Sequence, residues 1–127
     1  EVKRGLVAGG GGLLRLPQRI PYAIAMELAL TGDNLTATRA HELGLVNELT
    51  EPGGALDAAL ALAERITANG PLAVAATKRI IVESPDWSDA EKWEKQGAIL
   101  GPIFMSKDAR EGAVAFAEKR APQWTGS

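Results

Sequence analysis

Apolar residues along most of this chain recur at three- and four-residue spacing, which is the spacing of one face of an α-helix. The pattern is clearest after residue 55, where Leu56, Leu60 and Ile66 recur among alanines. Sequence signals for helix ends separate the apolar runs. We therefore expect a mostly helical chain, with helices over residues 21–30, 36–42, from 55 to about 69, 72–82, 88–104 and 108–120.

The helix boundaries follow from residues with known preferences at helix ends. Gly32 and Gly44 are suited to the left-handed position that ends a helix, and Thr36 is suited to the N-cap. Asn69-Gly70-Pro71 supplies one helix end and the next start. Ser88 followed by Glu91 is typical of a capping box, and Gly101-Pro102 predicts a kink or a split in the helix that follows.

Only the first part of the chain carries a strand pattern. The run 45–49 (LVNEL) is a short strand candidate, and Glu51-Pro52-Gly53-Gly54 ends it. The chain thus divides into residues 1–50, which hold a strand and a glycine-rich loop, and residues 51–127, which are helical. Because alanines dominate these helices and aromatic residues make up only 5%, we expect part of the apolar surface to be buried against another chain.

A lone carboxylate and a run of four glycines open the sequence. Glu1 is followed by Gly9 to Gly12 and then by a short apolar helix signal. A glycine-rich turn that opens a helix exposes backbone N–H groups, which can bind an anion, a carbonyl oxygen or a water molecule. The structural alternative is a flexible loop or a site of close packing. The run is not a phosphate-binding P-loop, because no Gly-Lys-Ser/Thr closes it.

The composition is that of an ordinary globular protein. The formal net charge is −2 with 24% charged residues, so no basic patch points to a nucleic-acid partner. No apolar run reaches the roughly 18 residues of a membrane span, so no membrane partner is expected. The absence of cysteine excludes disulfides and thiolate chemistry and is compatible with a cytoplasmic location. The chain begins with Glu and not Met, so we expect it to be part of a longer protein.

Few side chains suggest any other chemistry. His41 is the single histidine, which excludes a histidine-based metal cluster, so no metal site is expected. We expect His41 to cap or pack the helix that carries it. Trp87, Trp93 and Trp124 are expected to fill helix interfaces and not to form a ligand box.

Four local patterns follow one another along the chain. They are Glu1 with Gly5-Leu6, the glycines and Arg15-Leu16; AMELALTG at 25–32; AHELGLVN at 40–47; and DAREGAVAFAEKR at 108–120. In this order the patterns resemble the enoyl-CoA hydratase/isomerase, or crotonase, superfamily. The resemblance covers essentially the whole chain and implies the C-terminal half of a protein about twice as long. It implies an α/β crotonase fold, a spiral of ββα units, of which this half is mostly helical with one or two short strands.

The resemblance also implies a substrate and a mechanism. Similar proteins bind an acyl-CoA thioester and stabilise an enolate between two backbone N–H groups. The hydratases among them add water across the 2,3 double bond with two glutamates, and no cofactor is needed because CoA is part of the substrate. Glu1 matches the glutamate that transfers a proton at the α-carbon, and Gly9 matches the residue whose N–H holds the water. The first glutamate and both oxyanion donors belong to the half that is not present here.

The remaining site residues implied by the resemblance bind substrate. Leu6 matches a substrate-binding position, and Phe116 and Lys119 match positions that contact the CoA of a neighbouring subunit. Without the resemblance, Lys119 is simply a solvated charge on the last helix. The same resemblance implies a homotrimer or a hexamer made of two trimers, a role in fatty-acid β-oxidation, and residues 51–127 as the trimerisation region.

Two alternatives to the hydratase remain open. A double-bond isomerase of the same fold can work with a single glutamate. In the other alternative, the chain is a non-catalytic helical module for oligomerisation and CoA contact. In one respect the chain departs from the family pattern, because Ala8 stands where proline is common and the glycines run without an intervening alanine. This departure predicts a looser loop.

Overall fold

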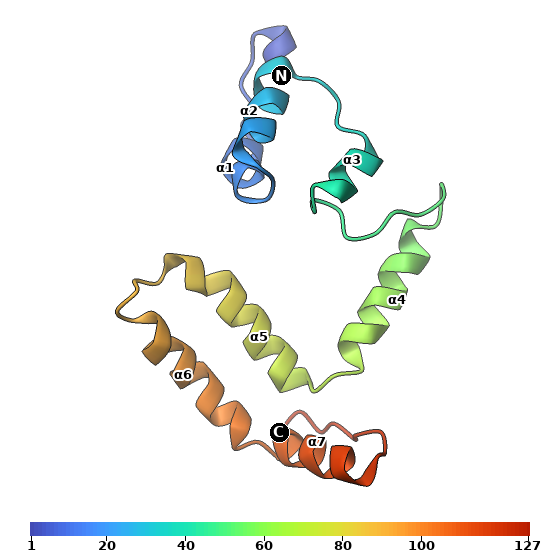
Figure 1. Ribbon diagram of the computed structural model, residues 1–127, viewed down its shortest axis with the longest axis vertical. Helices are drawn as coiled ribbons and strands as arrows, with labels where there is room; N and C mark the ends of the chain where they lie inside the picture. Colours follow the sequence, from blue (N-terminus) through green and yellow to red (C-terminus); the bar gives the residue numbers. More distant parts are fainter. The chain divides into compact units, whose positions relative to one another are not determined.

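The computed structural model describes all residues from Glu1 to Ser127 and consists of helices joined by turns and loops (Figure 1). It divides into two compact units, Glu1–Ala58 and Ala59–Ser127, and the division falls within helix α4 (Ala55–Thr67). The predicted boundary between residues 50 and 51 is not tested by this division and stays a prediction. Each unit is described on its own.

The first unit places short helices around one longer helix. The 3-10 helices η1 (Val2–Arg4) and η2 (Leu16–Gln18) both pack near α2 (Tyr22–Thr31). Helix α1 (Gly12–Arg15) leads directly into η2, and α3 (Ala37–Glu42) follows α2 after a short loop. This arrangement brings the start of the chain and the glycine loop to one side of α2.

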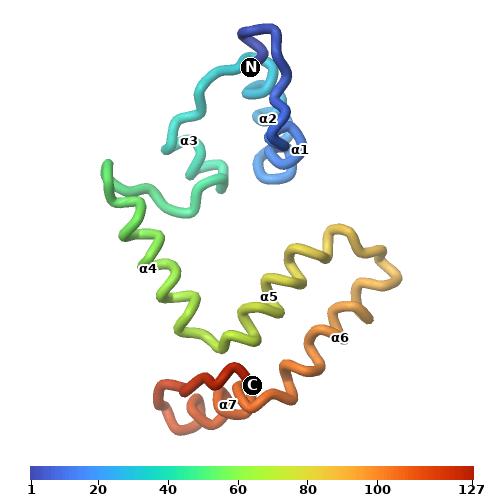
Figure 2. Tube along the Cα trace, turned by 180° about the vertical axis from the view of Figure 1, so that it is seen from behind, coloured from blue at the N-terminus to red at the C-terminus, as the bar shows by residue number.

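The second unit is a series of helices in which sequence neighbours pack together. Helix α5 (Pro71–Glu83) and helix α6 (Lys92–Phe104) lie side by side, joined through η3 (Ser84–Asp86), as both views show (Figures 1 and 2). Helix α7 (Lys107–Glu118) follows, and the last residues of the chain run back along it (Figure 2).

Most helix ends expected from the sequence are confirmed. Gly32 and Gly44 have left-handed φ values of 67° and 74°. The Thr36 hydroxyl accepts a hydrogen bond from the Arg39 N–H at 3.2 Å, as an N-cap should. Helix α5 begins at Pro71, directly after Gly70. These ends depend on local backbone preferences, which a sequence pattern can capture.

The expectation of one or two short strands is not confirmed, because the chain forms helices and loops only. Residues 45–49 form a bend and an extended loop, and the N–H of Leu45 turns back to the Ala40 carbonyl at 2.9 Å. A strand is defined by its hydrogen-bonded neighbour, and no other segment lies beside this one to form a ladder. The β-like composition of the run is therefore not sufficient to make it a strand.

The structure differs from two expectations about α6. The Ser88 hydroxyl donates to the Glu91 carboxylate at 2.6 Å and accepts no hydrogen bond from a helix N–H, and the helix begins only at Lys92. The helix is not split at Pro102, since it continues to Phe104, and the alternative of a kink there stays a prediction. Proline removes one backbone donor, and a helix with only one turn left after that point can tolerate the loss.

The aromatic residues and the histidine behave in different ways. Trp124 fills an interface as expected: its ring contacts the backbone positions Gly70 and Gly112, and its Nε1 donates to the Ala68 carbonyl at 2.8 Å. Trp93 does not, because 71% of it is exposed. His41 is exposed, so the expectation that it packs into the helix is not confirmed.

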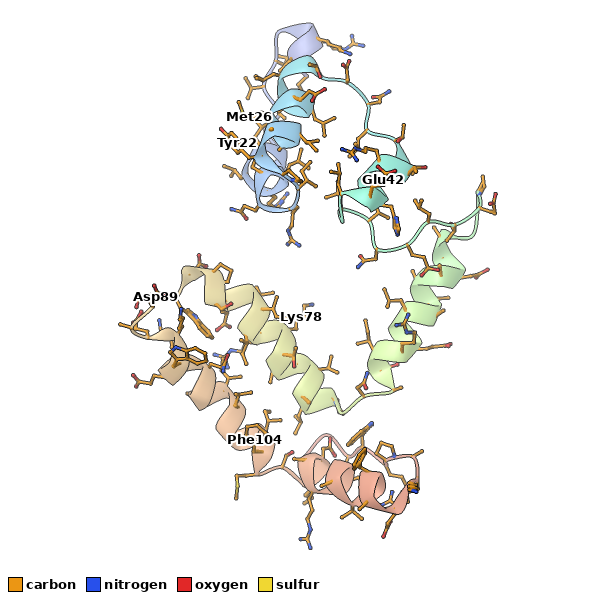
Figure 3. All side chains as sticks on the ribbon, viewed as in Figure 1. Tyr22, Met26, Glu42, Lys78, Asp89 and Phe104 are labelled. Carbon is orange, nitrogen blue, oxygen red and sulfur yellow. The ribbon has the colours of Figure 1, made fainter.

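Neither unit closes a sizeable apolar core. The buried apolar residues are Ile20 and four alanines, at positions 25, 40, 76 and 115. The chain exposes 10046 Å², whereas two separate compact globules of half its mass would together expose roughly 7,800 Å². Large apolar side chains such as Tyr22 and Phe104 are 67% and 72% exposed (Figure 3). The helices therefore present apolar faces that further polypeptide can cover. No helix is long and apolar enough to cross a membrane.

Candidate active site

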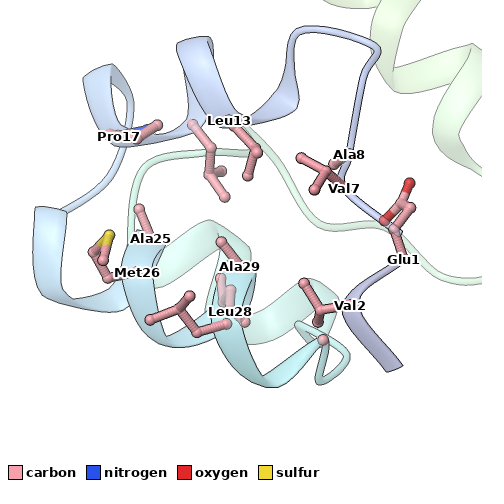
Figure 4. A pocket seen from close by; sticks show the side chains of 13 residues that line it. Glu1, Val2, Val7, Ala8, Leu13, Pro17, Ala25, Met26, Leu28 and Ala29 are labelled. Carbon is pink, nitrogen blue, oxygen red and sulfur yellow. The ribbon is translucent and has the colours of Figure 1, made fainter. Parts of the chain in front are cut away.

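An apolar pocket of about 390 Å³ lies in the first unit, between α2 and the segments that precede it (Figure 4). Small side chains of α2, Ala25 and Ala29, leave room for it on one side, and Leu13 faces them from α1. The size is that of a small-molecule site. The full lining comprises Glu1, Val2, Val7, Ala8, Leu13, Leu16, Pro17, Ala25, Met26, Leu28, Ala29, Leu30 and Gly32.

Glu1 supplies the only ionisable side chain of this lining. Its side chain lies beside Val7 and Ala8, at the end of the pocket away from Pro17 (Figure 4). The Glu1 carbonyl oxygen accepts hydrogen bonds from the N–H groups of Arg4 at 2.9 Å and Leu6 at 3.1 Å. The backbone turn of η1 therefore fixes Glu1 at the pocket wall.

A second anchor joins the Glu1 segment to the end of α2. Lys3 Nζ lies 2.7 Å from Asp33 Oδ1, and the hydrogen bond and charge of Lys3 lower the pKa of the Asp33 carboxyl. At Gly32, a Cβ atom would lie 3.1 Å from Val2 Cγ2 and 3.3 Å from Lys3 Cγ. Gly32 thus permits both the left-handed end of α2 and the close approach of η1.

The glycine loop is held by an arginine that follows it. Arg15 Nη2 donates to the Gly10 carbonyl at 2.9 Å, and Gly11 takes a left-handed φ of 85°. A Cβ atom on Gly11 would lie 2.8 Å from Arg15 Nη2, so a larger residue at this position would displace the guanidinium. This contact argues against the looser loop that the glycine run suggests.

The structure brings only some of the expected site residues together. Glu1 lines the pocket, and Gly9 directly follows the lining residue Ala8 without itself lining the pocket. Leu6 is 61% exposed and also lies outside the lining. Phe116 and Lys119 belong to the second unit, at the end of α7, where the Phe116 ring is 88% exposed.

Two groups of residues were missed by sequence reasoning. Arg15 belongs to one of the sequence patterns, but nothing in that pattern indicates its hydrogen bond to the Gly10 carbonyl. Near the C-terminus, Asp108 is buried at 4% exposure and Glu111 pairs with Arg120. These contacts join residues 9 to 18 positions apart, which helical periodicity does not predict. No three or more His, Cys, Asp or Glu side chains cluster where they could hold a metal ion.

The comparison with known protein families places the whole chain in one family. The model for enoyl-CoA hydratase/isomerase matches residues 1–127. The chain therefore belongs to the enoyl-CoA hydratase/isomerase family, and the resemblance found in the sequence is confirmed.

Individual relatives agree with the family. The chain is 45% identical over 124 residues to the enoyl-CoA hydratase EchA19 of Mycobacterium tuberculosis, covering 98% of this chain and 47% of that protein. It is 41% identical over 130 residues to the carnitinyl-CoA dehydratase of Salmonella arizonae, covering 99% and 50%. The chain thus spans about half the length of the curated relatives it matches.

A solved structure shows the same fold. The crystal structure of the enoyl-CoA hydratase EchA1 from Mycobacterium marinum matches with a TM-score of 0.96 and 76% identity, covering 100% of this chain and 50% of that one. The fold of the chain is therefore of the crotonase type. The fold class is confirmed, apart from the strands.

Proposed function

We propose that this chain forms the C-terminal half of an enoyl-CoA hydratase, which adds water across the 2,3 double bond of an acyl-CoA thioester. The observation that carries the proposal is a single carboxylate, Glu1, on the wall of an otherwise apolar pocket of about 390 Å³. The family membership and the relatives named as hydratases support the reaction class. No cofactor is needed, because CoA activates the substrate as its thioester.

In the proposed reaction, Glu1 acts on the proton at the α-carbon. A glutamate from the other half takes a proton from water, the hydroxyl adds at the β-carbon, and Glu1 gives a proton to the α-carbon. The negative charge that forms on the thioester oxygen is stabilised by two backbone N–H groups, also from the other half. The apolar lining keeps bulk water away, which strengthens these interactions.

The glycine loop has a separate role in this proposal. The Gly9 N–H holds the attacking water, and the Arg15 contact to Gly10 keeps the loop in one conformation. Holding water and substrate in reacting geometry lowers the entropic part of the barrier. Leu6 provides an apolar contact to the substrate close to this loop.

The second unit contributes to CoA binding and assembly in the proposal. Phe116 packs on the adenine and Lys119 pairs with a phosphate of the CoA bound by a neighbouring subunit. Exposed apolar side chains on α6 and α7, including Phe104 and Phe116, favour assembly into a trimer or a hexamer. The cytoplasmic location of the enzyme and its role in fatty-acid β-oxidation remain predictions.

The second candidate is the reverse reaction on a hydroxylated acyl-CoA. It is favoured by the carnitinyl-CoA dehydratase among the relatives, whose name describes loss of water. The same two glutamates serve both directions, because each proton-transfer step is reversible.

A product assay on the complete enzyme tests the proposal. Incubation with 2-butenoyl-CoA should yield 3-hydroxybutanoyl-CoA, identified by mass and by loss of the conjugated thioester absorbance. Movement of the double bond in a 3-enoyl-CoA without any hydration would instead identify an isomerase. Absence of turnover with both substrates and with a 3-hydroxyacyl-CoA, while CoA still binds, would leave only the non-catalytic module.

A further inference from the structure

The chain after α7 folds back and caps the start of the same helix. The buried Asp108 carboxylate accepts hydrogen bonds from the Thr125 N–H at 2.7 Å, the Thr125 hydroxyl at 2.9 Å and the Gly126 N–H at 2.9 Å. The Ser127 carbonyl accepts from the Lys107 N–H at 2.8 Å. The first N–H groups of a helix have no partner within it, so the returning segment satisfies two of them, because the Ser127 carbonyl also accepts from the Asp108 N–H at 3.2 Å.

A second connection ties the other end of α7 to the same segment. Arg120 donates from Nη1 and Nη2 to the two Glu111 oxygens, at 2.7 and 3.0 Å, and from Nε to Glu118 at 2.6 Å. Glu111 also accepts from the Gln123 N–H at 2.8 Å. Bidentate pairs of this kind fix the orientation of the guanidinium as well as its position. The residue directly before Arg120 is therefore held between a helix end and a doubly anchored side chain.

That residue, Lys119, has a strained backbone. Its φ of 54° and ψ of 39° lie in the left-handed region, and it is the only non-glycine residue of the chain with a positive φ. Glycine is the usual residue at this position after a helix, and another residue costs about 1–2 kcal/mol there. Strain of this kind persists only where the surrounding contacts enforce it, and it concentrates at functional sites.

The strained turn determines where two exposed side chains lie. The Lys119 N–H donates to the Phe116 carbonyl at 3.3 Å, so the backbones of these residues are directly joined. Phe116 is 88% exposed and Lys119 is exposed. Neither side chain is held by a hydrogen bond or ion pair of its own, so the backbone alone sets their spacing.

We propose that Glu111 and Arg120 are positioning residues for CoA binding, because they lock the left-handed turn that joins Lys119 to the backbone of Phe116. This inference rests on the proposed CoA contact of Phe116 and Lys119. Neither Glu111 nor Arg120 touches the ligand. Their effect is to hold the two ligand contacts in place before binding, which reduces the ordering cost that binding would otherwise carry.

A double-mutant cycle on the complete enzyme tests the role. Arg120→Ala and Lys119→Ala should each raise the Kd for free CoA about tenfold. Because Arg120 acts through Lys119, adding Arg120→Ala to a Lys119→Ala variant should raise the Kd for CoA by less than a further factor of two. Arg110→Ala, on the exposed surface of the same helix, is the matched control and should leave the Kd unchanged.

Arg120→Lys provides the same test if Arg120→Ala fails to fold. Lysine keeps the charge but cannot form the bidentate pair, so the Kd should again rise. The positioning role alone would be overturned if Arg120→Ala raised the Kd for CoA by the same factor with and without Lys119. It would also be overturned if Arg120→Lys left the Kd unchanged. An unchanged Kd in Lys119→Ala would overturn it together with the CoA contact, while hydration measured in the same preparations reports on the proposed reaction separately.

Discussion

Arg15 closes the glycine loop by donating a hydrogen bond from its guanidinium to the carbonyl oxygen of Gly10 at 2.9 Å. The same side chain covers Gly11, where a Cβ atom would lie 2.8 Å from Nη2. A run of four glycines is thus given one conformation by a single side chain that lies outside the run. This contact supports a loop that holds a water molecule beside Glu1.

Removal of this contact should therefore reduce catalysis more than binding. In Arg15→Ala, the loop gains freedom and the attacking water is misplaced, so kcat should fall roughly ten- to a hundredfold. The Kd for CoA should change little. Arg19→Ala removes an exposed arginine from the same unit and is the control. Steady-state hydration kinetics provide the measurement, and equal kcat values for the two variants would contradict the role of Arg15.

Gly32 and Gly44 offer a matched pair for the anchor beneath Glu1. Both have a left-handed φ, but a Cβ at Gly32 would meet Val2 at 3.1 Å, whereas a Cβ at Gly44 meets nothing within 4 Å. Alanine should cost about 1–2 kcal/mol of stability at either site through backbone strain. Only Gly32→Ala also displaces η1, so kcat should fall roughly tenfold or more in that variant alone. Similar kcat values in both variants would show that η1 does not set the position of Glu1.

The C-terminal clasp, in which Asp108 and the Glu111–Arg120 pair hold the returning residues 123–126 along α7, should weaken in acid. The hydrogen bonds from Arg120 and, as the next largest cause, the hydrogen bond from the Gln123 N–H lower the pKa of Glu111 to about 2 from its ordinary 4.5. A lowered folded-state pKa means that the stabilisation is complete above about pH 5 and is lost as the pH falls from 4.5 towards 2. The pKa of Asp108 is lowered as well, chiefly by the Thr125 N–H, and its contribution is lost in the same direction.

Thermal unfolding as a function of pH checks this expectation. Glu111→Gln should have a lower Tm than the wild type at pH 6, and the difference should shrink as the pH approaches 2.5. Glu94→Gln, an exposed glutamate of α6, should show no such convergence. A Tm difference that stays constant over this range would contradict an ionised Glu111 in the clasp.

Lys119→Gly should change stability and binding in opposite directions. Glycine relieves the left-handed strain, so the free energy of unfolding should rise by about 1 kcal/mol. The ammonium group is lost, so the Kd for CoA should rise about tenfold at low salt and less at high salt. Denaturant unfolding and calorimetric titration measure the two effects. A variant that is more stable and binds CoA equally well would show that the strain has no binding role.

The sequence predicted those features of the fold that depend on neighbouring residues. Thr36 as a cap, Gly32 as a helix end and Gly70-Pro71 as a boundary each act within one helical turn. The prediction of a strand at 45–49 is not confirmed, because a strand needs a hydrogen-bonded neighbouring strand and none of the described residues supplies one. The prediction of a cap at Ser88 is wrong because its hydroxyl donates to the Glu91 carboxylate and accepts from no backbone N–H of the helix.

The candidate site was predicted only in part for a similar reason. Glu1 and the glycine loop are close in sequence and lie in one unit, so motif reasoning could associate them. The contacts that fix them, Lys3 with Asp33 and Val2 with Gly32, span about thirty residues and have no periodic signal. The hydrogen bonds of Asp108 with Thr125 and Gly126 could not be predicted, because an aspartate at a helix start is ordinarily solvated.

The role of Glu1 in proton transfer is tested most directly by Glu1→Gln in the complete enzyme, with Glu27→Gln on the exposed surface of α2 as the control. Glutamine keeps the size and polarity of the side chain but cannot donate or accept the proton. The account predicts that kcat for hydration of 2-butenoyl-CoA falls by a factor of about 10² to 10⁴, while the Kd for CoA is unchanged. A kcat for Glu1→Gln equal to that of Glu27→Gln would contradict it.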